Sequence, residues 1–194
     1  WEVAQAQDAI TQLDSDTRVS AASWDAAVGS AGTAIAAAAA VTEGRILSAF
    51  VAARPPGHHA TPDRAMGFCL FNSIAITARW LQAHSLAERV LIVDWDVHHG
   101  NGTQDAFYTD PSVFFLSLHQ SPHYPGTGAA DERGAGEGIG YTMNVPLPAG
   151  TSRSDYLERF EGAWDEVMDT FAPDFVLMSA GFDVMAGDPL GDQL

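Results

Sequence analysis

Two adjacent pairs of histidines, His58 with His59 and His98 with His99, account for four of the seven histidines in this sequence and could do acid–base or metal chemistry. The first pair lies in residues 54–60 (RPPGHHA) and the second in residues 94–102 (DWDVHHGNG). A third segment, residues 179–189 (SAGFDVMAGDP), adds Asp183. Each segment follows an apolar run that is typical of a buried strand. Because ligand sites in open parallel sheets lie beyond the carboxyl ends of the strands, we expect the three segments to converge on one site.

The second segment has the composition of a metal site. Asp94, Asp96 and His98 alternate along the expected strand end and would therefore share one face. Two carboxylates and an imidazole are costly to bury together unless a cation lies among them. One of these aspartates, with His98 and Asp183, would supply three ligands and leave a fourth position open, as in a catalytic zinc site. The alternatives are a solvated strand end for residues 94–98 and a helix N-cap for Asp183.

His58 and His59 are expected to face the same site. Two neutral imidazoles beside a water activated by a metal can act as general base and general acid in the cleavage of an acyl bond. Asp94, if it is not a metal ligand, can accept a hydrogen bond from one imidazole and raise its basicity. The alternative is a polar turn in which one histidine is bonded to the backbone.

The elements that would position these residues alternate between helix and strand. Apolar periodicity predicts helices over residues 1–10, 23–41 (with Ser23 as N-cap), 71–84 and 155–171. Short apolar runs predict strands over residues 45–53, 90–93, 113–116, 143–147 and 175–178. This order favours one α/β domain with a mainly parallel sheet. Residues 120–140 form a long Gly- and Pro-rich loop with a functional role, in which residues 131–133 are expected to be solvated.

Composition excludes several classes of protein. The 194 residues include 46% hydrophobic side chains, which argues against disorder. The 25 acidic residues against 9 basic ones, all of them Arg, give a net charge of −16, which argues against direct nucleic-acid binding. The most apolar window, residues 34–41, is too short to span a bilayer, so we expect no membrane partner. No signal peptide is visible, and the single cysteine, Cys69, fits a reducing cytoplasm.

Six motifs in this order resemble the zinc-dependent histone deacetylase superfamily, in its bacterial class II-like branch that includes acetylpolyamine amidohydrolases. They are RPPGHHA, GFCLFN, VDWDVHHGNGTQDAF, SLHQ, PGTG and SAGFD with GDP after it. The resemblance covers residues 14–192. It implies an arginase-like three-layer αβα fold with a mainly parallel sheet.

The resemblance also implies roles for individual residues. Asp96, His98 and Asp183 match the zinc ligands. His59 matches the general base and acid, and His58 a mainly electrostatic partner. Asp94 would pair with His58, and Asn101 would face His59. The implied substrate channel is lined by Gly67, Phe68, Tyr124 and Leu190.

Structural monovalent cations, K⁺ or Na⁺, are implied in the same way. The first site would lie near Asp94, Asp96, His98, Ser117 and Leu118. The second would lie near Phe107, Asp110, Val113 and Tyr141.

The implied reaction is zinc-dependent hydrolysis of acetylated lysine in a protein or of a small acetylated amine. Leu190 is apolar where polyamine-preferring members tend to carry an acidic residue, which favours acyl-lysine. Ser73 stands where the family has Asn or Asp after FN. The family's oxyanion-stabilising Tyr, on a Gly-rich loop beyond GDP, has no counterpart in residues 1–194. We therefore expect a partial deacetylase domain that lacks N- and C-terminal parts.

Two other functions remain open. One is a catalytically impaired module that binds acyl ligands without turning them over. The other is an arginase-like dimanganese hydrolase of guanidino groups, which needs more carboxylates at the last strand than Asp183 and Asp188 supply.

Overall fold

The computed structural model describes residues 10–193, so most of the helix predicted over residues 1–10 lies outside the described residues. The chain divides into two compact units, and the boundary between them in the sequence lies between Leu86 and Ala87. The expectation of one partial domain over residues 1–194 stays a prediction.

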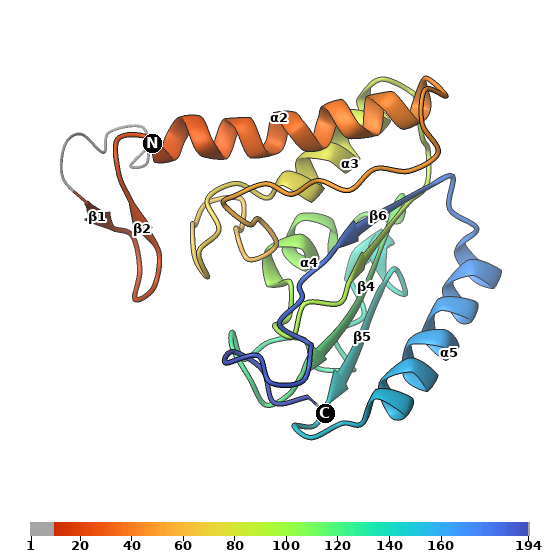
Figure 1. Cartoon of the computed structure of the whole chain (residues 1–194). Helices are drawn as coiled ribbons and strands as arrows, with labels where there is room; N and C mark the ends of the chain where they lie inside the picture. The colour runs from red at the N-terminus through yellow and green to blue at the C-terminus, as the bar shows by residue number, and fades with distance from the viewer. Residues whose placement is uncertain (1–9, 194) are drawn as a thin grey trace. The chain divides into compact units, whose positions relative to one another are not determined.

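The first unit contains a small hairpin and two helices. Strands β1 (Thr11–Gln12) and β2 (Arg18–Val19) pair antiparallel and were not predicted. Helices α2 (Ser23–Thr42) and α3 (Ser73–Ala83) lie side by side (Figure 1). The N-cap of α2 is Ala22 rather than Ser23, whose hydroxyl accepts the backbone N–H of Ser20 instead. Asn72 caps α3 by accepting the backbone N–H of Ala75.

Helix α2 extends well beyond residues 34–41, the most apolar window of the sequence. It has the length and composition needed to cross a membrane, with a mean hydropathy of 1.3, and 28% of its most apolar window is buried. A core helix meets the same criterion, so a single helix of this kind is weak evidence for a membrane span. The expected absence of a membrane partner stays a prediction.

The strand predicted over residues 45–53 is wrong, because this segment has no regular secondary structure. Leu47 and Phe50 are 99% and 72% exposed. An apolar run indicates burial, but a strand also needs a neighbouring strand that accepts and donates its backbone hydrogen bonds. The described part of the first unit offers no such neighbour to this segment.

The second unit is built on a four-stranded sheet in the order β5-β4-β3-β6, and all its strands are parallel. The two central strands consist of residues that are buried throughout, as covering on both faces requires. The predicted α/β class with a parallel sheet is therefore confirmed. The strands are β3 (Val90–Asp94), β4 (Val113–Gln120), β5 (Thr142–Leu147) and β6 (Phe175–Ser179).

Helix α5 (Arg153–Phe171) packs on this sheet, in agreement with its predicted amphipathic pattern (Figure 1). Val167 and Phe171 contact a core formed by strand residues such as Leu91, Phe114 and Leu116. A second helix, α4 (Asn101–Phe107), was not predicted, and a 3-10 turn forms at Gly136–Gly138. The core thus fixes the carboxyl ends of β3, β4 and β6, from which the candidate site extends.

Candidate functional site

Three predicted metal ligands come together in the second unit. Asp96 and His98 follow β3, and Asp183 follows β6, the strand that pairs with β3. Each offers a ligand atom, and these atoms all lie within 4.8 Å of one another. His98 Nδ1 is 2.9 Å from Asp96 Oδ1 and 3.1 Å from Asp183 Oδ2. All three side chains are mostly buried, which makes this a compact N/O donor set.

Strand alternation does not produce this arrangement, contrary to the sequence-based argument. Strand β3 ends at Asp94, and the chain then bends. The carboxylate of Asp94 accepts the backbone N–H of Asp96 at 3.1 Å, and that of Asp96 accepts the N–H of His98 at 2.9 Å. Asp183 Oδ1 accepts the N–H of Val97 at 3.0 Å. The carboxylates therefore shape the turn that presents them.

The donor set fits a divalent metal. Two ligands that each lie about 2.0–2.1 Å from a tetrahedral zinc are roughly 3.3 Å apart, which is close to the distances from His98 to the two carboxylates. Gly181 leaves room for the carboxylate of Asp96, because a Cβ at position 181 would come within 2.2 Å of Asp96 Oδ2. Burial alone would lower the pKa of His98, but hydrogen bonds to Asp183 and Asp96 and their negative charge raise it to about 9. The cluster thus favours a cation among its carboxylates.

The other predicted catalytic residues have defined positions. His58 and His59 belong to the first unit, where both are buried and their ring centroids lie 3.9 Å apart. Gly67 lies against His59, because a Cβ on Gly67 would come within 2.3 Å of its ring. In the second unit, Asp94 is fully buried and Asn101 begins α4. The predicted pairings of Asp94 with His58 and of Asn101 with His59 join the two units and stay predictions.

The predicted cation sites also stay predictions. Ser117 lies opposite Asp94 in the register of β3 and β4, one residue before Leu118. For the second site, Phe107 ends α4, and its carbonyl accepts the N–H of Asp110 at 3.0 Å. Tyr141 precedes β5, and its carbonyl accepts the N–H of Phe115, two residues after Val113.

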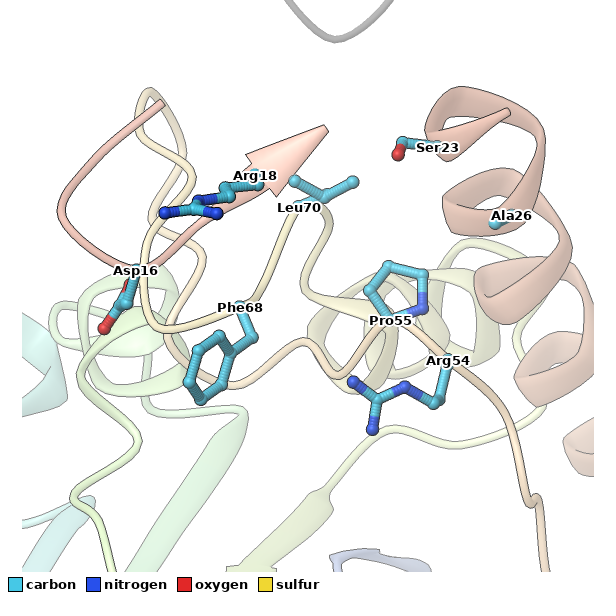
Figure 2. Close-up of a pocket in the computed structure, with 8 residues that line it drawn as sticks. All are labelled: Asp16, Arg18, Ser23, Ala26, Arg54, Pro55, Phe68 and Leu70. Atoms are coloured by element: carbon cyan, nitrogen blue, oxygen red, sulfur yellow. The ribbon is translucent and has the colours of Figure 1, made fainter. Parts of the chain in front are cut away.

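The predicted channel residues lie in both units. In the second, the rings of Tyr124 and His98 form a T-shaped pair with centroids 6.1 Å apart, and Leu190 is 49% exposed. In the first, Phe68 follows Gly67 and lines a cavity of about 300 Å³ (Figure 2). The other residues that line this cavity are Asp16, Arg18, Ser23, Ala26, Arg54, Pro55 and Leu70.

A buried polar network that the sequence analysis missed holds the Gly-rich loop. Glu132, expected in a solvated loop, instead accepts hydrogen bonds from Gln104 Nε2 at 2.6 Å and from the N–H groups of Gly128 and Ala129. Gln104 Oε1 also lies 3.1 Å from His99 Nε2. The sequence carried no signal for Glu132, because only the fold brings α4 to the loop.

Removal of the Glu132 charge is expected to destabilise the protein. Burial alone would raise the pKa of Glu132, but the hydrogen bonds from Gln104, Ala129 and Gly128 lower it below its ordinary value of 4.5. Its contribution to stability is therefore complete above pH 4.5 and is lost as the pH falls through the lowered pKa. We expect Glu132→Gln to lower the free energy of unfolding by about 1 kcal/mol at pH 7, with solvent screening included.

Chemical denaturation at several pH values checks this prediction. The difference between wild type and Glu132→Gln should shrink as the pH falls below 4.5. Glu137→Gln, at an exposed position in the same loop, is the control and should change little. Equal effects of the two substitutions would contradict the assigned network.

Comparisons with known proteins agree with the resemblance seen in the motifs. Residues 2–193 match the family model of the histone deacetylase domain. A probable deacetylase of Archaeoglobus fulgidus is 46% identical over 178 residues, which are 92% of this chain and 49% of that protein. Histone deacetylase 15 of Arabidopsis thaliana is 48% identical over 91% of this chain and 33% of its own length.

Solved structures show the same relationship. The HD domain of HDA15 superposes with a TM-score of 0.91 at 46% identity, over 95% of this chain and 54% of that one. Acetylpolyamine aminohydrolase from Burkholderia pseudomallei superposes with a TM-score of 0.88 at 45% identity, over 93% of this chain and 52% of that one. The chain thus spans about half the length of these structures and half or less of these curated relatives.

Proposed function

The chain belongs to the histone deacetylase domain family, and from this we propose that it is a zinc-dependent amidohydrolase that removes acetyl groups from lysine side chains. The cluster of Asp96, His98 and Asp183 carries this proposal. Within residues 10–193 it is the one group of three such side chains with ligand atoms this close together. A cytoplasmic location is proposed with it, in keeping with the buried Cys69 being in the thiol form and not in a disulfide.

The proposed mechanism assigns a task to each residue. Asp96, His98 and Asp183 would hold the metal and leave a further coordination position for water or substrate. Bound zinc would supply a Lewis acid for the acyl carbonyl and acidify water. His59 would accept the proton of the attacking water and deliver it to the leaving amine, while His58 supports its charge. The close fit of Gly67 against His59 would hold that imidazole in place.

The single metal cluster disfavours the arginase-like alternative. A dimanganese site needs additional carboxylates close to the first three ligands. Asp188, the next carboxylate after Asp183, is half-buried and accepts the backbone N–H of Leu190 at 2.9 Å. It therefore serves a turn, which supports a mononuclear site.

Two features support acyl-lysine rather than an acetylated polyamine as the substrate. Leu190, a proposed channel residue, is apolar and would offer no carboxylate to a second ammonium group. The cavity that Phe68 lines has two guanidinium groups, those of Arg18 and Arg54, against the single carboxylate of Asp16 (Figure 2). Inside the cavity this balance of charge favours a neutral peptide over a polycation, although the net charge of −16 attracts cations to the protein as a whole.

Hydrolysis assays on the full-length gene product test the proposal. We expect stoichiometric zinc, loss of deacetylation with a strong chelator, and recovery when one equivalent of zinc is added. We also expect kcat/KM for an acetyl-lysine peptide to exceed that for an acetylated polyamine by at least about tenfold. Deacetylation that survives chelation would refute the metal mechanism. Zinc binding without any turnover would favour the acyl-ligand binding module.

A further inference from the structure

His123, in the loop after β4, contacts two segments that carry the proposed metal ligands. Its ring stacks on the ring of His98, with centroids 4.8 Å apart and an interplanar angle of 18°. Its Nε2 lies 2.8 Å from the carbonyl oxygen of Leu190. Because a carbonyl oxygen only accepts, Nε2 carries the hydrogen and donates. One side chain thus contacts a proposed ligand directly and also the segment that follows Asp183.

The segment after Asp183 returns to the carboxyl end of β4. Gln120 binds Asp192 twice, since its Nε2 donates to Asp192 Oδ2 at 3.1 Å and its Oε1 accepts the backbone N–H of Asp192 at 2.9 Å. The carbonyl of Asp192 accepts the N–H of Gly150 at 2.7 Å. The carbonyl that His123 binds lies two residues before this anchor. His123 and Gln120 therefore fasten the same returning segment.

We propose that His123 is a positioning residue for the metal centre. Its ring fixes the plane of the His98 imidazole, and its Nε2–H holds the segment whose other end is Asp183. Groups that orient metal ligands typically change metal affinity by about 10–100-fold when they are removed. The inference rests on the proposed function, because it assumes that His98 and Asp183 bind the metal.

Zinc affinity is the measurement that isolates this role. The dissociation constant is determined by competition with a chromogenic chelator on the full-length gene product. We expect His123→Ala to weaken zinc binding about 10–100-fold. His123→Phe keeps a flat ring but loses the donor and should lie between wild type and His123→Ala. His84→Ala is the matched control, since His84 is an exposed histidine that also packs on an aromatic ring, that of Trp80.

The rise in melting temperature on addition of zinc provides a second readout. If His123 only stabilised the fold, His123→Ala would lower the melting temperature with and without metal by the same amount, and this would overturn the inference. Zinc binding as tight in His123→Ala as in His84→Ala would also overturn it. If His123→Ala fails to fold, His123→Leu replaces it in both measurements. A wild-type protein that binds no zinc would instead contradict the proposed function itself.

Discussion

Asp183→Ala is expected to abolish stoichiometric zinc binding and to lower the deacetylation rate by roughly 10³-fold or more. The substitution removes Oδ2, which lies 3.1 Å from His98 Nδ1. It also removes Oδ1, which accepts the N–H of Val97 and so shapes the turn between Asp96 and His98. Removal of a residue that only orients a ligand lowers zinc affinity by about 10–100-fold, and loss of a direct ligand should lower it by more than that.

Asp183→Asn separates these two contributions. The amide oxygen can still accept the Val97 N–H, but the negative charge is gone. We therefore expect zinc binding to fall as in Asp183→Ala while the thermal stability of the metal-free protein falls less. Metal analysis and melting curves of both variants provide the comparison.

Asp188→Ala is the matched control for a nearby carboxylate. In a mononuclear site Asp188 binds no metal, so its removal should leave the zinc content unchanged. Loss of metal in Asp188→Ala would favour a dinuclear centre and contradict the mononuclear proposal. Full zinc content in Asp183→Ala would remove the basis of the whole assignment.

The strands of the second unit were predictable because their apolar runs are unusually uniform. Residues 90–93 and 113–116 contain only hydrophobic side chains and form the two central strands, β3 and β4. The run over residues 45–53 has a similar composition but does not form a strand. Composition reports the tendency of a segment to be buried, whereas a strand also depends on a partner far away in sequence.

The candidate metal ligands were predictable from residue type, although the geometric reason for their proximity was not. Alternation along a strand was the expected cause, but hydrogen bonds from backbone N–H groups to Asp94 and Asp96 position them instead. His123 and Glu132 could not be found in this way. Each acts through a contact that only the fold creates, His123 with Leu190 and Glu132 with Gln104.

His59→Ala is expected to lower kcat for an acetyl-lysine peptide by about 10²–10⁴-fold, the range for loss of a general acid–base group. Zinc content should stay at the wild-type level, because the three proposed ligands come from other residues. The variant should also lose the limb of the kcat–pH profile that reports the base. This combination distinguishes His59 from Asp183, whose removal lowers activity and metal content together.

Gly67→Ala tests the position of His59 rather than its chemistry. A Cβ at Gly67 would come within 2.3 Å of His59 Cδ2, and Gly67 has a positive φ of 56°. The imidazole must therefore shift, so kcat should fall although both histidines and the metal ligands are present.

For His59→Ala, the control is His84→Ala, which removes an exposed imidazole instead. Wild-type kcat in His59→Ala would show that His59 does not carry the proton in this reaction.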